Sequence, residues 1–371
     1  MCTRIFNSQN KALPVTGRNM DWYWQLSSSL YAFPRGLKRQ GVDQTYADVN
    51  RFRENGIEIF EWTSIYSSIV TVLEYPSSKV SYAAADGMNE KGLVANALYD
   101  GETVFPDETT SSKPRLSILR LVQYLLDTCT SVEKSIEAIE SKQYLLIAEE
   151  MPDSSAVPPV MHICLSDVSG DSAIVEFRGE KVCIYHSHEY RVATNEPSYD
   201  GQLILNEYWR FQTGLSEIKN PMPSIMAAPG GASAVQRFER ASYYLNFSLP
   251  EEEDYLAVAQ TRSIMGMCSQ PISFDMRMMS RETTDAKPRT SRTIWTNLAD
   301  HEGLKYYVAN SQTMNAFYLE IDAIGTETKR VFIMEDSSVH HTARNNTASG
   351  NVADQLEPSN DPFGKTLVIR S

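Results

Sequence analysis

The cysteine directly after the first methionine is the residue of this chain best placed to do chemistry. Cys2 opens the segment MCTRIF, and removal of Met1 would leave Cys2 with a free α-amino group. An α-amine has an ordinary pKa of about 7.7–8.0, so near neutral pH it takes up and releases a proton far more readily than lysine does. The thiol and amine of one residue would then supply a nucleophile and its base, which together can attack an amide carbonyl. Position alone leaves the alternative open that Cys2 is an ordinary thiol in a strand.

Composition argues against several other kinds of chemistry. The chain of 371 residues has 34 basic and 47 acidic side chains and a formal charge of −13, which disfavours nucleic acid as a partner. Its five cysteines are never spaced as CxxC and its six histidines lack HExxH spacing, so we expect neither a metal site nor a disulfide framework. There is no run of about 18 apolar residues, so we expect no membrane span.

The first twenty residues show no secretory signal pattern. As the sequence stands we therefore expect a cytoplasmic protein, or a periplasmic or secreted one if a leader was removed.

Strands dominate the first hundred residues. Segments 3–6 and 13–18 predict a hairpin around a polar turn at 8–11, which brings Cys2 and Arg18 to strand ends. Further strands are predicted at 30–33 and 68–73, and at 82–85 and 93–98 on either side of the presumed turn DGMNEKG.

Helical spacing of apolar residues begins at Leu116. We predict helices at 116–126 and 132–139 over one face of a sheet, then a second meander of strands at 160–165, 172–177, 182–186 and 190–193. Helical patterns return at 201–211, 235–245 and 252–265, before strands at 293–296, 305–308 and 316–321. These elements predict an α/β (α+β) fold, a four-layer αββα sandwich of two antiparallel sheets flanked by helices.

We expect a single domain over residues 1–330. The Pro- and Ser-rich stretches at 152–159 and 221–231 are interpreted as loops within it. Residues 331–371 are expected to form a polar, partly disordered C-terminal segment, with a mobile insertion at 337–362 and a last strand at 366–369.

Five short segments occur in the order in which a known family carries them. They are MCTR at the start, TGRNMDW at 16–22, DGMNEKGL at 86–93, ATNEPSYDGQL at 193–203 and AVQRFERA at 234–241. Together they resemble the choloylglycine hydrolase family, which comprises bile salt hydrolases and penicillin V acylases within the N-terminal nucleophile hydrolases. The resemblance covers roughly Cys2 to Ile324, and it implies a sandwich of the N-terminal nucleophile hydrolase type.

The resemblance implies roles for three residues of the N-terminal hairpin. Cys2 would be the nucleophile and, through its α-amine, the base. Arg18 would lie beside Cys2, where its fixed positive charge favours the thiolate and helps to orient the carbonyl. Asp21 would accept a hydrogen bond from the α-ammonium and hold it in place.

Three more distant residues complete the implied site. Asn195 would be the side-chain donor of an oxyanion hole, and Tyr99 would supply a backbone N–H to the same hole. Arg237 matches a second arginine in the charged network near the nucleophile.

Each of these assignments has a plainer alternative. Arg18 and Asp21 can be a surface pair at a strand end, Asn195 can shape the turn before Pro197, and Arg237 can belong to a solvated helix face. We assign DGMNEKG no catalytic role, because its glycines suit a tight connection between strands. The joint occurrence of the motifs in family order is what favours the functional interpretation.

The implied reaction is hydrolysis of a linear N-acyl amide through a thioester, and it needs no cofactor. In the family, an aromatic residue at the position of Tyr99 is common in penicillin V acylases, whereas bile salt hydrolases often have asparagine there. We therefore expect a penicillin V acylase-like specificity, with Trp22, Trp24 and Tyr99 lining the acyl site, although at least one tryptophan can be plain core.

The segment between Asn195 and Arg237 is shorter than in many bile salt hydrolases. It resembles the short-loop branch, which also includes enzymes that cleave long-chain N-acyl homoserine lactones, so these are a second substrate class to consider. A conjugated bile salt hydrolase is the alternative. The expected partner is a small N-acyl amide, and we expect a homo-oligomer, with a tetramer as one option.

Two other kinds of protein are alternatives for a chain with an N-terminal cysteine. A glutamine amidotransferase domain also begins with a catalytic cysteine, but no GHTRWATHG-like segment is found here. A non-catalytic member of the family would retain Met1 and merely bind acyl ligands.

Overall fold

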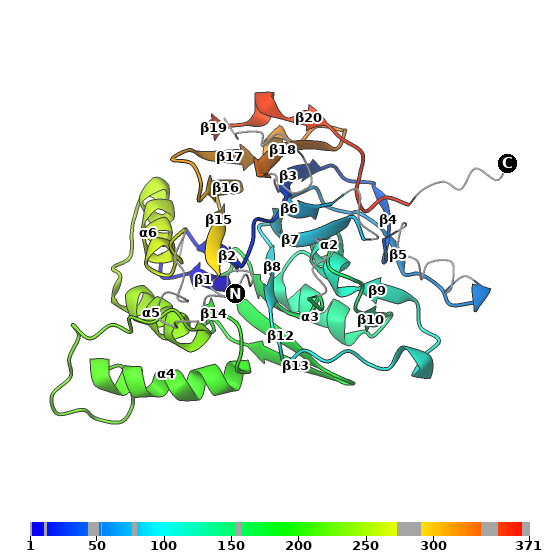
Figure 1. Ribbon diagram of the computed structural model, residues 1–371. Helices are drawn as coiled ribbons and strands as arrows, with labels where there is room; N and C mark the ends of the chain where they lie inside the picture. The colour runs from blue at the N-terminus through cyan, green and yellow to red at the C-terminus, as the bar shows by residue number, and fades with distance from the viewer. Residues whose placement is uncertain are drawn as a thin grey trace, which may run out of the picture.

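Two large β-sheets packed face to face form the centre of the molecule, with helices on their outer faces (Figure 1). The computed structural model describes residues 2–10, 13–43, 52, 54–75, 80–152, 157–272, 291–334 and 348–365. The expected αββα sandwich of two sheets flanked by helices is thereby confirmed. Within the described residues, none of the helices has the length and apolar character needed to cross a bilayer.

The first sheet has seven strands in the order β14-β1-β2-β15-β16-β17-β19. All of its pairings are antiparallel except that of β17 with β19. Its strands are β1 (Cys2–Asn7), β2 (Val15–Trp22), β14 (Val192–Ala193), β15 (Arg292–Asp300), β16 (Lys305–Asn310), β17 (Ala316–Glu320) and β19 (Gly350–Asn351). The predicted N-terminal hairpin is therefore present, with β2 running beyond its expected end.

The second sheet has nine antiparallel strands in the order β13-β12-β11-β8-β7-β6-β3-β18-β20. They are β3 (Ser28–Phe33), β6 (Ser68–Glu74), β7 (Tyr82–Asn89), β8 (Val94–Tyr99), β11 (Met161–Ser166), β12 (Ser172–Arg178), β13 (Lys181–His186), β18 (Lys329–Met334) and β20 (Glu357–Pro358). Two small sheets lie outside it: β4 (Lys38–Gln40) with β5 (Glu61–Thr63), and β9 (Arg115–Ser117) with β10 (Leu145–Ile147).

The helices are divided between the two sheets. Helices α2 (Ile118–Thr128) and α3 (Val132–Glu140) lie on the side of the nine-stranded sheet, whereas α5 (Ala234–Phe247) and α6 (Asp254–Met267) lie against the seven-stranded sheet, with α4 (Tyr199–Thr213) packed on α5. Short 3-10 helices occupy Glu108–Thr110, Ile321–Ala323 and Ala353–Gln355.

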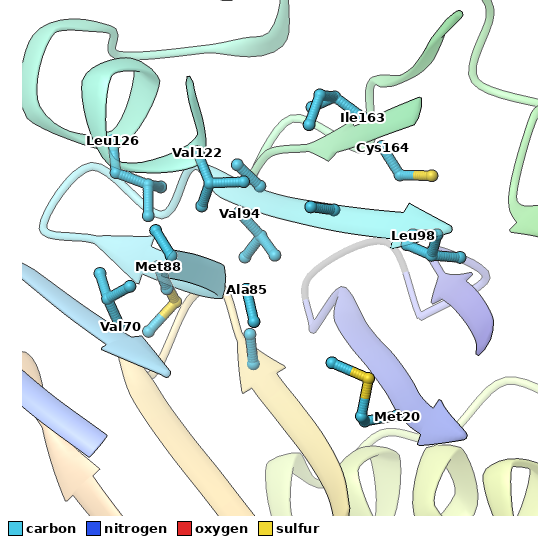
Figure 2. Close-up of a cluster of buried hydrophobic side chains, with 14 of the residues drawn as sticks. Met20, Val70, Ala85, Met88, Val94, Leu98, Val122, Leu126, Ile163 and Cys164 are labelled. Atoms are coloured by element: carbon cyan, nitrogen blue, oxygen red, sulfur yellow. The ribbon is translucent and has the colours of Figure 1, made fainter. Parts of the chain in front are cut away.

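Local sequence explains where two of these helices begin. The side chains of Ser117 and Ser131 accept hydrogen bonds from backbone N–H groups in the first turns of α2 and α3. Apolar residues at helical spacing then place Val122 and Leu126 against the nine-stranded sheet. Figure 2 shows these two side chains directed from α2 onto β7 and β8.

Two sequence-based predictions about connections are corrected by the structure. The strands after residue 160 do form the predicted meander, since β11, β12 and β13 pair in order, and the pairing of β11 with β8 adds them to the sheet that contains β7. The segment predicted at 190–193 leaves this sheet and pairs with β1 as β14. DGMNEKG is mostly strand: β7 continues to Asn89, so only the residues after it form the turn to β8.

The expected domain boundary at residue 330 falls inside β18, which pairs with β3. The described part of the C-terminal segment, 348–365, adds one short strand to each large sheet through β19 and β20. The predicted strand at 366–369 lies outside the described residues.

Candidate active site

Cys2 is the first residue of β1, a strand paired with β2 on one side and β14 on the other. It is only 2% exposed, so its backbone and thiol are held inside the sheet. The Cys2 nitrogen donates a hydrogen bond to Asn195 Oδ1 at 2.8 Å, and the Cys2 carbonyl accepts one from Arg237. The backbone of the candidate nucleophile is therefore fixed at both its nitrogen and its carbonyl.

Arg18 reaches the sulfur from the neighbouring strand. In the register of the hairpin Cys2 lies opposite Met20 and Arg18 lies opposite Arg4, so Arg18 is two register positions from Cys2 and on the same face of the sheet. Its Nη2 donates to Cys2 Sγ at 3.4 Å and to the Ala97 carbonyl at 2.8 Å. A fixed positive charge at this distance stabilises negative charge on the sulfur.

Arg237 binds several groups around Cys2 at once. It is fully buried, and besides the Cys2 carbonyl it donates to Thr3 Oγ1 at 2.6 Å and to Asn195 Oδ1 at 2.8 Å. Asp21 Oδ2 lies 3.6 Å from the same guanidinium, and Asp21 Oδ1 accepts a hydrogen bond from Thr293 at 2.6 Å. Asp21 is expected to hold the α-ammonium that removal of Met1 would create. In the full chain the Cys2 nitrogen is a peptide N–H that donates to Asn195, and Arg237 lies between Asp21 and the Cys2 carbonyl.

The side-chain amide of Asn195 has a defined orientation. Its Oδ1 accepts hydrogen bonds from the Cys2 nitrogen and from Arg237, so its Nδ2 must be the end that donates to the Tyr99 carbonyl at 2.7 Å. An amide nitrogen carries two protons, and only one is used in this bond. The second is available to an oxygen that develops negative charge beside Cys2.

Strand β8 separates from β7 before it reaches Tyr99. The β7–β8 register ends at the pair of Asp86 and Asn96, and beyond it the strands diverge. The carbonyl of Ala97, the next residue of β8, accepts its hydrogen bond from Arg18 instead. The divergence therefore opens the edge of β8 to side chains from the other sheet.

The hydrogen-bond pattern between β8 and β11 indicates where the Tyr99 N–H points. On the β11 side, Asp100 N donates to the Val160 carbonyl at 3.0 Å, and Tyr99 is opposite Met161. Because hydrogen-bonded and non-hydrogen-bonded pairs alternate in an antiparallel ladder, the N–H and carbonyl of Tyr99 point away from β11. Its carbonyl receives Asn195, which places the backbone of Tyr99 on the side of the nucleophile.

Asp86 belongs to the site although sequence reasoning gave its motif no role. It is fully buried in β7, its Oδ2 lies 3.6 Å from Arg18 Nε, and its Oδ1 accepts hydrogen bonds from Tyr306 and from Asn297. Burial raises the pKa of Asp86, and the charge of Arg18 opposes that shift. The strand predicted at 82–85 ends just before Asp86, and the structure extends it through this residue to Asn89.

A narrow apolar pocket extends from the sulfur. It encloses about 40 Å³, and Cys2 and Arg18 lie in its wall with Trp22 and Tyr99. The other lining residues are Met20, Leu26, Leu73, Ala83, Ala84, Ala85, Ala97, Met151, Pro159 and Met161. The rings of Trp22 and Tyr99 meet edge to face at 5.7 Å. Trp24, which is also expected to line the acyl site, packs edge to face against Trp22 at 5.6 Å and is not among the described lining residues.

Comparison with known proteins agrees with this geometry. The sequence matches the model of the linear amide C–N hydrolases, choloylglycine hydrolase family, over residues 2–327, so the chain belongs to this family of hydrolases. A penicillin V acylase from Pectobacterium atrosepticum is 30% identical over 338 residues, which are 87% of this chain and 81% of that protein. A bile salt hydrolase/transferase from Clostridium perfringens is 23% identical over 358 residues, 92% of this chain and 99% of that protein.

Among solved structures, penicillin V acylase from Agrobacterium tumefaciens superimposes with a TM-score of 0.74 at 30% identity, covering 98% of this chain and 99% of that one. The protein is thus a linear amide C–N hydrolase with the fold of N-terminal nucleophile hydrolases.

Proposed function

We propose that the chain hydrolyses linear N-acyl amides through Cys2 as an N-terminal nucleophile, after the residue before it has been removed. The observation that carries this proposal is the contact between Arg18 and Cys2 Sγ at 3.4 Å, with the Asn195 amide and the Tyr99 backbone beside it. A buried thiol next to a guanidinium and an oriented amide donor is suited to acyl transfer.

The proposed steps use only groups of this chain. The α-amine of Cys2 takes the thiol proton, and the sulfur attacks the carbonyl carbon. The carbonyl oxygen takes up the negative charge, which Asn195 Nδ2 and the Tyr99 N–H stabilise. The C–N bond then breaks, the leaving amine receives the proton, and water hydrolyses the thioester to the free acid. Arg18 stabilises the thiolate, whereas Arg237, with Asp21 behind it, holds the Cys2 carbonyl and Asn195 in place.

The pocket supports a slim acyl group as the substrate. At about 40 Å³ the pocket is smaller than the roughly 300–1,000 Å³ of typical ligand pockets, so its wall must move to admit any acyl group, and it must move less for a flat phenoxy ring or an extended chain than for a fused steroid. An edge of Trp22 or Tyr99 can meet such a ring, and the alanines beside them leave the pocket apolar. We therefore propose phenoxyacetyl amides such as penicillin V first, long-chain N-acyl homoserine lactones second, and conjugated bile salts as the alternative.

The nucleophile is tested by Cys2→Ala and Cys2→Ser in a hydrolysis assay. Both variants should lose activity by about 10³-fold or more, while circular dichroism and the unfolding midpoint stay close to wild type. Intact mass should show that Met1 is absent from the active wild type. Retention of Met1 on most molecules, or activity in Cys2→Ala, would refute the proposal and favour a non-catalytic acyl-binding member of the family.

The acyl preference is tested by one panel with the same enzyme preparation. Penicillin V, a long-chain N-acyl homoserine lactone, and glycine- and taurine-conjugated bile acids are compared by kcat/KM. We expect penicillin V to be the best substrate, and Tyr99→Ala to lower its kcat/KM by about tenfold through loss of aromatic contact. A bile acid as the best substrate would overturn this ranking.

A homo-oligomer is proposed on different evidence. Apolar side chains are exposed along α4 and the loop after it, among them Ile204 at 74%, Met222 at 85% and Met226 at 88%. Exposed apolar surface of this kind is typical of subunit contacts. Light scattering after size-exclusion chromatography measures the mass directly, and a monomer across the micromolar range would contradict the proposal.

A further inference from the structure

A charged cluster lies directly behind Tyr99 and Asn195, on the side away from the pocket. Arg178, the last residue of β12, donates to Asp100 Oδ2 at 2.6 Å and lies 3.0 Å from Glu176 Oε2. Both carboxylate side chains are 2% exposed, and Arg178 is 21% exposed. A planar guanidinium held between two buried carboxylates fixes the distance between them.

The first carboxylate is part of the segment that carries Tyr99. Asp100 is the next residue along the chain, and it also accepts hydrogen bonds from Glu102 N and Thr103 Oγ1, both at 3.0 Å. A shift of Asp100 therefore moves the end of β8, where the Tyr99 carbonyl accepts a hydrogen bond from Asn195.

The second carboxylate is joined to the segment that carries Asn195. Glu176 Oε1 accepts a hydrogen bond at 2.7 Å from the backbone nitrogen of Tyr199, the first residue of α4. Only three residues separate Asn195 from Tyr199, and Gln202 on α4 donates to the Glu196 carbonyl at 3.1 Å between them. Arg178 thus connects the two backbone segments that form the proposed oxyanion hole.

A metal ion is the other group that such a cluster suggests. Asp100, His162 and Glu176 each offer a ligand atom, and these atoms lie within 4.8 Å of one another. The guanidinium of Arg178 already forms an ion pair with each carboxylate, and with Asp100 a hydrogen bond as well, so the positive charge that they require is present. Burial lowers the pKa of His162 to about 4, so this ring adds no second positive charge near neutral pH.

We propose that Arg178 is a positioning residue, which sets the separation of Tyr99 and Asn195 across the oxyanion hole through its two buried carboxylate partners, Asp100 and Glu176. This inference rests on the proposed function of Cys2. A catalytic group misplaced by about 1 Å can cost about 10²-fold in rate, so the bridge affects the transition state without touching the substrate. Lysine at this position would hold one carboxylate at a time and would restore the geometry only in part.

Arg178→Met and Arg178→Lys test the inference on the active full-length enzyme. We expect kcat for the preferred amide to fall about 10- to 100-fold in Arg178→Met and less in Arg178→Lys, with KM within about twofold. Alkylation of Cys2 by iodoacetamide should stay within about twofold of wild type, because it needs the thiolate but no oxyanion hole. A wild-type kcat in Arg178→Met, or an equal loss of alkylation, would overturn the inference.

Arg330→Met is the matched control. Arg330 is 27% exposed and bonds to the buried Glu74 at 2.6 Å, in the same sheet but between β18 and the end of β6. Both Arg178→Met and Arg330→Met should lower the free energy of unfolding, but kcat of Arg330→Met should stay within about twofold of wild type. A tenfold loss of kcat in this control would overturn the assignment to Arg178.

If Arg178→Met does not fold, Glu176→Gln tests the same inference from the other side of the ion pair. Glutamine keeps an acceptor for Tyr199 N but turns an amide towards Arg178, so kcat should still fall about tenfold; an unchanged kcat would overturn the inference. The wild type is assayed first. Absence of hydrolysis of every amide there would refute the proposed function, whereas an active wild type with equally active variants would refute only the role of Arg178.

Discussion

The two faces of β7 differ in what they bind, although the residues alternate along one strand. Gly87 and Asn89 face α2: a Cβ on Gly87 would lie 3.0 Å from Leu126 Cδ1, and Asn89 Nδ2 donates at 2.8 Å to the carbonyls of Leu126 and Cys129. Asp86 faces the other sheet, where it meets Arg18 and Asn297. One strand thus packs a helix with one face and supports the candidate nucleophile with the other.

The difference shows how the fold separates stability from chemistry. The helix side is filled mainly by apolar residues such as Val122 and Leu126. Their contribution to the free energy of unfolding depends on buried area and packing. The side that faces β2 and β15 holds charged and amide groups. Their energetic contribution depends on their position and on having a hydrogen-bonding or charged partner. Substitutions on the two faces should therefore have separable effects on unfolding and on catalysis.

The largest effect on stability is expected on the helix side. Leu126 is fully buried between α2 and β7, and Leu126→Ala removes its packing and leaves a cavity. Such substitutions cost about 2–5 kcal/mol. Chemical denaturation should show this loss, whereas kcat at a temperature where the variant is folded should equal that of wild type. A lower kcat in the fully folded variant would show that the two faces are coupled.

Asp86→Asn should affect catalysis more than folding. The asparagine Oδ1 can still accept from Tyr306 and Asn297, but its Nδ2 then faces Arg18 Nε, so two donors oppose each other across 3.6 Å. Arg18 should move from its place beside the sulfur. We expect kcat/KM to fall about 10²-fold, equivalent to about 2.7 kcal/mol, and Cys2 alkylation to slow as well. Unchanged alkylation would argue against an action through Arg18.

Much of the fold could be predicted because the signals are local. The helix predicted at 132–139 is α3 at Val132–Glu140, since its apolar spacing and its cap at Ser131 lie within the segment itself. The pairing of β14 with β1 could not be predicted in this way, because it joins residues almost two hundred positions apart. Asp86 was misjudged for a related reason: glycines in DGMNEKG suggested a turn, and only pairing with β6 reveals the strand.

In the candidate site, likewise, the residues could be predicted from the sequence but most of their contacts could not. The family resemblance identified six residues, Cys2 among them, that lie in one connected set of contacts. It did not predict that the peptide nitrogen of Cys2 donates to Asn195 Oδ1, nor that Arg178, which lies outside every motif, pairs with Asp100 and Glu176. Such partners depend on where sheets diverge and which loops meet, and a single sequence does not contain that information.

Asp127→Asn is the closest comparison to Asp86→Asn, and of the variants discussed it should have the smallest effect on catalysis. Asp127 is also fully buried beside an arginine, but it lies on α2, where it accepts from Arg39 at 2.8 Å and from Trp62 at 2.6 Å. Burial raises the pKa of Asp127 from 3.8 to about 6, against the opposing charge of Arg39. The folded protein therefore keeps this proton where the unfolded chain has already released it.

The direction of the pH dependence of stability follows from this difference in pKa between the folded and unfolded chain. Stability contributed by Asp127 is greatest at low pH and is lost as the pH rises from about 4 through about 6. Asparagine does not titrate, so between pH 4 and 7 the stability of wild type should fall relative to Asp127→Asn by about 1–3 kcal/mol, with kcat unchanged. Urea titrations at several pH values measure the difference. A constant difference would exclude the raised pKa, and a loss of kcat like that of Asp86→Asn would remove the distinction between the two faces of β7.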